Sequence, residues 1–207
     1  MDYQYLFLRP EPNTAQTMLD KFSIVELIEF ERFCRDNAQW DEMEKCFTQD
    51  SRVTISWFQG SGWEFVEASK KMTNPAPHKL YNTAVWLNGD RAVSLTMCTI
   101  CTRVHLDGQA VDLSSDAKLL YRTQRIDGRW MVAGFEGIYE KDSLVPVFPT
   151  DGLKIPPEEI AKYRPTYAAL SLCLGRQGYA IDNSLPGIDR PDLIGKAYAE
   201  AEAWLAQ

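Results

Sequence analysis

Concentrated positive charge and long apolar runs are both missing from this sequence. The 22 Lys and Arg residues are outnumbered by 29 Asp and Glu residues, for a net charge of −7, and they form no cluster. Nucleic acid and anionic membrane surfaces are therefore poor candidates as partners. The segment 1–9 carries Leu6, Phe7 and Leu8 but no basic region and no long apolar core, so we expect neither a signal peptide nor a membrane span.

Cysteine is scarce and irregularly placed. The five residues are odd in number and show no framework spacing, which favours a reducing, cytoplasmic setting; they are Cys34, Cys46, Cys98, Cys101 and Cys173. Cys98 and Cys101 form a C-x-x-C, but residues three apart on a strand point to opposite faces. The sequence has no second such pair and no acid–histidine spacing typical of a metal site. It also lacks a phosphate-binding glycine loop and a G-x-S-x-G elbow, so we expect no metal and no cofactor.

The 207 residues, 45% of them hydrophobic, suffice for one well-filled core and an extension. Ser23 and Glu26 have the spacing of a capping box, which predicts a helix start. Behind them apolar residues recur at three- and four-residue steps, as on one flank of a helix: Ile24, Leu27, Ile28, Phe30 and Cys34. We expect helical structure over Ser23–Phe47, preceded by an irregular arm at 1–22 that contains Pro10, Pro12 and Asn13.

Asp36 lies near the end of the first predicted helix, three residues after Phe33 and four before Trp40. That alignment favours a carboxylate directed toward the interior, where loss of water raises its pKa and suits it to proton transfer. The alternative is a carboxylate that caps the next helical turn or faces solvent.

Strand patterns follow the helices. Residues 53–58 alternate with period two, and a short helix is expected from Trp63 to about Met72. From His78 onward, β-rich runs end at Asn88-Gly89, Asp107-Gly108 and Asp127-Gly128, dipeptides that supply the positive φ of tight hairpins. The long run at 92–104 is expected to curl. Helices first and an antiparallel meander after predict an α+β domain with helices on one face of the sheet.

Three stretches together resemble a known family. They are Asp36–Asp41 with Asp50–Val53, His78–Asn82 before Asn88–Ala92, and Arg125–Trp130. The chain is similar here to the SnoaL-like branch of the nuclear transport factor two-like superfamily, whose members include polyketide cyclases and scytalone dehydratase. The resemblance implies a cone-shaped curved antiparallel sheet packed with N-terminal helices, a cystatin-like α+β roll, over residues 23–145.

Residues 146–207 are predicted to form a C-terminal helical extension, with helical stretches at Glu158–Leu174 and Asp192–Ala206. Each has an aromatic and leucine face but is too small for a domain of its own, so we expect them to wrap the cone or a neighbouring subunit. The resemblance also implies a homodimer formed through the exposed face of the sheet.

The resemblance to scytalone dehydratase assigns a catalytic aspartate to Asp36 and its partner histidine to His78. Such a carboxylate fixes the tautomer of the imidazole and leaves the other ring nitrogen to move a proton. The alternative for His78 is a histidine held by a backbone carbonyl. Other positions depart from that enzyme: this chain has Arg35, Ile55, Thr102 and Leu119 where the dehydratase has two tyrosines, a second histidine and an asparagine.

The remaining histidine, His105, stands at a hairpin end and is expected to face solvent. Aromatic residues are more often core than ligand wall, but we predict that Trp57, Tyr81 and Tyr121 shape a pocket for an apolar, ring-shaped molecule.

The leading hypothesis is a cofactor-independent lyase, cyclase or isomerase that acts on a small, largely apolar metabolite such as a polyketide or terpenoid. The first alternative is a non-catalytic binding module of the same fold, because a fold does not decide a function. The second is an interaction protein whose tail binds a partner.

Overall fold

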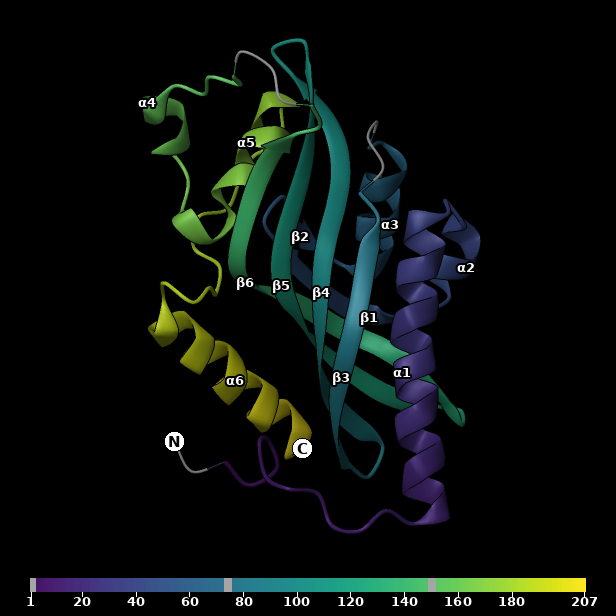
Figure 1. Cartoon of the computed structure of the whole chain (residues 1–207). Helices are drawn as coiled ribbons and strands as arrows, with labels where there is room; N and C mark the ends of the chain where they lie inside the picture. Colours follow the sequence, from purple (N-terminus) through teal and green to yellow (C-terminus); the bar gives the residue numbers. More distant parts are fainter. Residues whose placement is uncertain (1–2, 73–75, 149–151) are drawn as a thin grey trace.

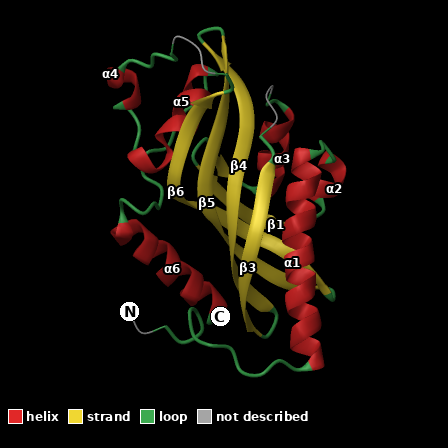
Figure 2. Cartoon of the chain, in the orientation of Figure 1, coloured by secondary structure: helices red, strands yellow, loops and turns green. Residues whose placement is uncertain are grey.

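The computed structural model describes residues 3–72, 76–148 and 152–207. A long, curved six-stranded sheet occupies the centre, with helices on both of its faces (Figure 1, Figure 2). The strands lie in the order β2-β1-β6-β5-β4-β3, and β1 runs parallel to β6 while the other neighbours are antiparallel. Strands and helices in one sheet-centred layer arrangement confirm the α+β class.

The predicted meander is present, and its strands are longer than their sequence patterns suggested. They are β3 (His78–Asn88), β4 (Arg91–Leu106), β5 (Gln109–Ile126) and β6 (Arg129–Pro146). Asp107-Gly108 and Asp127-Gly128 form the last two turns, with positive φ at all four residues. In the first turn Asn88 pairs with Arg91, so the two turn residues are Gly89 and Asp90 rather than Asn88 and Gly89.

Interruptions in strand register accompany the curvature of the sheet (Figure 2). The pairing of β3 with β4 shifts between Leu80 and Thr83, and β5 with β6 shifts after Asp116 and again after Arg122. An extra residue in one strand bends it and increases its twist. The predicted curl of β4 is therefore accompanied by extra residues in other strands of the sheet, β3 and β6.

Helix α1 (Ala15–Asp36) begins earlier than predicted. Its capping box is formed by Thr14 and Thr17, so the prediction that Ser23 and Glu26 cap this helix is wrong. Met18, Leu19 and Phe22 are exposed, so the first turns of α1 lack the apolar, inward-facing residues by which the helix is recognised in the sequence. Phe30 and Phe33 are exposed as well and do not share the buried flank of Ile24, Ile28 and Cys34.

After α1 the chain forms the short α2 (Trp40–Glu44) and then enters β1 (Phe47–Ile55), so the second predicted helix ends before Phe47. The strand β2 (Phe58–Gly60) folds back on β1, and α3 (Gly62–Lys70) follows as expected. A Cβ at Gly62 would lie 2.3 Å from the ring of Phe47, so glycine permits α3 to approach β1 closely.

The predicted helical stretch Glu158–Leu174 is interrupted in the structure. It consists of α4 (Pro157–Ile160), the 3-10 helix η1 (Pro165–Tyr167) and α5 (Ala168–Arg176). Arg164 is extended because the residue before a proline avoids helical angles. The last helix, α6 (Pro191–Leu205), closely matches its prediction.

Two hydrophobic cores lie on opposite faces of the sheet. The inner core joins the sheet to α1, α3 and α5, with Ile28, Phe65 and Tyr121 among its buried residues. The outer core lies under α6, where Ala201 packs with Leu120 and other residues. Figure 1 shows α1–α3 and α6 on either side of the strands. Among the described helices, none is long and apolar enough to cross a membrane.

Candidate functional site

A narrow cavity of about 50 Å³ lies within the inner core. Its walls come from α1, the end of β1 with the turn after it, residues 72 and 76 between α3 and β3, strands β3–β6 and α5, and they are mostly apolar. The lining residues are Arg32, Arg35, Ile55, Ser56, Trp57, Met72, Ala76, His78, Ile100, Ala117, Leu119, Phe135, Gly137, Tyr139, Leu170 and Leu174. Few polar groups converge on an apolar space, which is the usual composition of a small-molecule site.

Asp36 and His78 meet at this cavity. Asp36 is the last residue of α1 and His78 the first of β3. The backbone N–H of His78 donates to Oδ2 of Asp36 at 2.6 Å, and Nδ1 of the ring lies 2.8 Å from Oδ1. Both carboxylate oxygens thus bind one residue. The contact with Oδ1 places the ring proton on Nδ1 and leaves Nε2 unprotonated.

Both side chains are largely removed from water, with 7% of His78 and 14% of Asp36 exposed. Burial opposes the charge of Asp36, but the hydrogen bonds and charge from His78, together with Arg32, lower its pKa overall. Burial also lowers the pKa of His78 to about 4, and the charges of Arg32 and Arg35 add to this against the opposing bond from Asp36. At neutral pH the site therefore holds a carboxylate beside a neutral imidazole.

Two arginines on α1 face the same cavity with different partners. The guanidinium of Arg32 binds Glu31 through two nitrogens, and Glu31 also accepts from the hydroxyl of Tyr121 at 3.1 Å. Burial opposes ionisation of Arg32, but Glu31 and its other neighbours raise its pKa. The Glu31–Arg32 pair is thus neutral as a unit, and the Arg32 guanidinium lies 5.0 Å from the ring centroid of Phe135.

The three aromatic residues predicted to shape the pocket lie in different places. Trp57 lines the cavity as expected. Tyr121 is fully buried beneath it and bonded to Glu31, so it does not form the predicted wall. Tyr81 is 57% exposed and its hydroxyl accepts from Thr99, so it too lies outside the cavity. Phe33 is exposed, and the predicted alignment of Asp36 with this ring is wrong even though the carboxylate does point inward.

Several lining residues were not singled out from the sequence. Arg32 and the α5 residues Leu170 and Leu174 carry no motif, and their place at the cavity depends on how α1 and α5 pack. Tyr139 also lines it; burial raises the pKa of this phenol to about 12, so its hydroxyl stays protonated. Arg35 and Ile55 also line this space.

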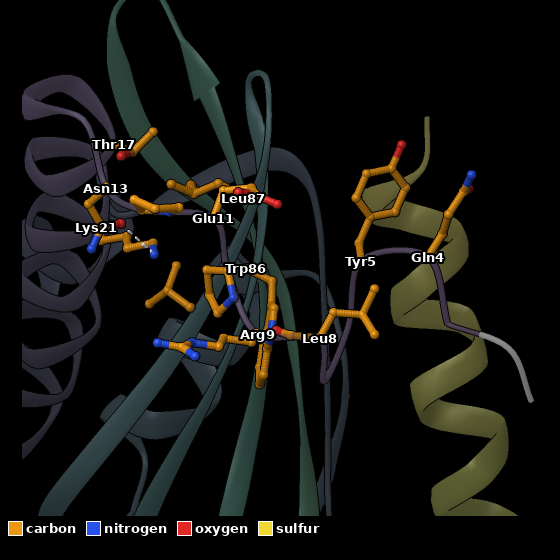
Figure 3. A pocket seen from close by; sticks show the side chains of 13 residues that line it. Gln4, Tyr5, Leu8, Arg9, Glu11, Asn13, Thr17, Lys21, Trp86 and Leu87 are labelled. Atoms are coloured by element: carbon orange, nitrogen blue, oxygen red, sulfur yellow. Dashed lines mark hydrogen bonds between the residues drawn. The ribbon is translucent and has the colours of Figure 1, made fainter.

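A separate surface pocket of about 330 Å³ lies between the N-terminal segment, the start of α1 and β3 (Figure 3). Arg9, Glu11 and Lys21 supply charged groups there, and Lys21 donates to Asn13 at 2.9 Å. Within the described part of the chain, this pocket and the inner cavity share no lining residue. Over the same residues, no group of three or more His, Cys, Asp or Glu side chains is placed to hold a metal ion.

Residues 16–136 match the SnoaL-like domain. The chain belongs to this family. The matched segment contains both Asp36 and His78, together with the helices α1–α3 and most of the sheet. The family placement by resemblance is thus confirmed.

A relative and two solved structures extend this result. Pea pathogenicity protein 2 of Fusarium vanettenii is 26% identical over 159 residues, covering 74% of this chain and 68% of that protein. A candidate scytalone dehydratase from Novosphingobium aromaticivorans superposes with a TM-score of 0.55 at 13% identity, covering 70% of this chain and 99% of that one. The type 3 hexachlorocyclohexane dehydrochlorinase LinA of Novosphingobium barchaimii gives 0.55 at 14% identity, covering 68% and 97%. At these identities the two structures establish a shared fold. The names of two other similar structures call this fold cystatin-like.

Proposed function

We propose that this protein is a cofactor-independent acid–base enzyme, a lyase, cyclase or isomerase, acting on a small and largely apolar molecule such as a polyketide or terpenoid. One observation carries the proposal: Asp36 holds His78 through both carboxylate oxygens at the wall of an apolar cavity. A histidine fixed in one tautomer, with its second nitrogen left to exchange a proton, is the arrangement of a general base.

The proposed chemistry starts with the neutral imidazole. Its Nε2 takes a proton from the substrate, and the resulting imidazolium is balanced by the adjacent carboxylate of Asp36. The same proton then returns to a leaving group or to another carbon. His78 is the catalytic acid–base, Asp36 orients it, and Trp57 with the aliphatic side chains shapes the space around the substrate.

The names of two fold neighbours, a dehydratase and a dehydrochlorinase, both describe eliminations. This favours a lyase among the three reaction types. The cavity of about 50 Å³ is narrow beside the 300–1,000 Å³ of typical ligand sites, so binding of a substrate with rings requires lining side chains to move.

The second candidate is a binding module without catalysis, and the narrowness of the cavity is the observation that favours it. Proton exchange separates the two candidates. We expect the protein to accelerate exchange of the acidic C–H protons of 2-tetralone, a two-ring ketone, in D₂O as followed by NMR. The His78→Gln variant should lose about 10²–10⁴-fold of this rate.

His105→Gln is the matched control, because this histidine is exposed at the end of a strand. Equal exchange rates for wild type and His78→Gln, with both proteins folded by circular dichroism, would rule out the acid–base function and favour the binding module.

A further inference from the structure

The guanidinium of Arg35 faces the cavity with an incomplete set of partners. Its side chain is 8% exposed, and in the described part of the chain no acceptor binds its buried Nε. Nη2 contacts Sδ of Met72 at 3.2 Å, and a thioether is a weak acceptor. Nη1 lies 3.7 Å from Oδ1 of Asp36, an oxygen that already binds His78. A buried donor without an acceptor is costly unless a ligand completes it.

Arg32, one helical turn earlier, makes the contrast clear. Glu31 occupies two nitrogens of Arg32 and balances its charge inside the protein. Burial and then the charge of Arg32 lower the pKa of Arg35 to about 10, which still leaves it cationic at neutral pH. Of these two cavity-facing arginines, Arg35 is the one that no carboxylate binds through two nitrogens, and its buried Nε remains for a bound molecule.

Proton transfer adds an electrostatic requirement. When His78 accepts a proton it becomes a third cation beside Arg32 and Arg35, whose charges already oppose its protonation. Asp36 balances one of these charges, and negative charge that appears on the substrate at the same time makes the step more favourable. Arg35 is placed to bind that charge, since it borders both the cavity and the Asp36–His78 pair.

We propose that Arg35 is a catalytic residue that binds an oxyanion, and that the substrate is an enolisable carbonyl compound. This rests on the proposed acid–base function. Nε2 of His78 removes the proton on the α-carbon, the C–H electron pair forms the enolate C=C bond, and the carbonyl π pair moves onto the oxygen. Nε and Nη2 of Arg35 donate to that oxygen, which displaces the thioether of Met72.

The electron pair then returns from the enolate oxygen. In a β-hydroxy compound it expels the hydroxyl, which takes the proton from His78 and leaves as water. In an isomerisation His78 returns the proton to a different carbon. Either route regenerates the neutral imidazole, and no oxidant or reductant is needed.

The probe for this site is 4-nitrophenol, because its phenolate resembles an enolate in charge and its absorption reports ionisation. We expect the wild-type protein to bind it as phenolate at a pH below the pKa of the free phenol. Arg35→Met should weaken this binding about 10–100-fold, the usual effect of removing a hydrogen bond to a charged group. Arg103→Met, which removes an exposed cation on β4 that does not line the cavity, should leave it unchanged.

Exchange of the 2-tetralone protons tests the oxyanion role of Arg35 separately from the acid–base role of His78. We expect Arg35→Met to lose about 10²–10³-fold of the rate, as when one oxyanion donor is removed, and Arg35→Lys to recover part of it. His78→Gln should lose exchange but keep phenolate binding.

Wild-type exchange that depends on His78 but not on Arg35 would overturn the oxyanion assignment and leave the proposed function standing. Phenolate binding that depends on Arg35, without any His78-dependent exchange, would support the anion site and refute the acid–base function. Absence of phenolate binding by the wild type overturns the assignment. Circular dichroism and the Arg35→Lys variant guard against a folding defect.

Discussion

At the scale of single residues, the two oxygens of Asp36 serve different donors on one neighbour. Oδ2 accepts the backbone N–H of His78, and Oδ1 contacts its ring. The first bond fixes where β3 begins relative to the end of α1, and the second fixes the tautomer. A carboxylate can accept twice in this way, whereas an amide offers one acceptor oxygen and one donor nitrogen.

Asp36→Asn should therefore weaken both bonds, because an amide oxygen is a poorer acceptor than a carboxylate, and its NH₂ group can donate to Nδ1 only when the ring proton moves to Nε2. We expect a loss of about 1.5–3 kcal/mol in the free energy of unfolding, the usual contribution of hydrogen bonds to a charged group. Urea denaturation measures it, and Asp50→Asn, at an exposed position of β1, is the control. Equal loss in both variants would contradict a specific role for Asp36.

The lowered pKa of His78 predicts how stability depends on pH. The pKa is about 4 in the folded protein and ordinarily about 6.5, so the unfolded chain binds more protons between these values. Stability should be fully present above pH 6.5 and fall as the pH decreases to 4, by up to about 3 kcal/mol.

Urea denaturation of wild type and His78→Gln across this range tests the sign, since the variant should lose that part of the slope. The rate of 2-tetralone proton exchange should likewise decrease on the acid side of its pH profile with a midpoint near pH 4. An acid limb near 6.5 would show that the imidazole is not buried in the way described.

At the scale of elements, α5 forms one wall of the cavity although it belongs to the C-terminal segment. Leu170 and Leu174 line the space, and the N–H of Leu170 donates to Asp142 of β6 at 2.8 Å. Burial raises the pKa of Asp142 to about 6, against the opposing helix amides. The tail thus packs on the sheet of its own chain, one of the two arrangements predicted for it.

Leu174→Ala should enlarge the cavity and admit bulkier ketones, at a cost of about 2–5 kcal/mol in unfolding free energy. Leu172→Ala is the matched control, because Leu172 is fully buried on the same helix without lining the cavity. Both variants should lose stability, and only Leu174→Ala should shift the size of ketone that undergoes exchange. The same shift in both would contradict the assignment of this wall.

At the scale of the whole molecule, α6 and the N-terminal segment cover part of the outer face of the sheet. Leu6, Ala197 and Ala201 pack there against Val93 and Leu120. The homodimer implied by family resemblance stays a prediction for sedimentation to test, but this part of the face is not exposed as we expected.

Glu202 on α6 fixes the N-terminal segment by accepting three successive backbone N–H groups, those of Gln4, Tyr5 and Leu6, at 2.6–3.0 Å. Glu202→Ala should release this segment, and limited proteolysis should then cleave before α1 at a higher rate. Glu200→Ala, which removes an exposed carboxylate from the same helix, should not. Proton exchange should persist in both, because neither residue lines the cavity.

The sequence by itself determined the last two hairpin turns, and the family resemblance of its motifs supplied the Asp36–His78 pair. Few dipeptides other than Asp-Gly, Asn-Gly and Gly-Gly readily adopt positive φ at two successive residues, so the local sequence specifies those turns. The pair came from motifs whose order matches the family, since nothing local brings the end of a helix to the start of a distant strand.

Tertiary packing decided the rest of the site. The register shift between Leu80 and Thr83 leaves both Tyr81 and Asn82 exposed, which defeats an argument from alternation alone. Arg32 and Arg35 differ in their hydrogen bonds because Glu31 binds one of them and not the other. Contacts between residues far apart in the chain depend on the packing of whole elements, and no local pattern encodes them.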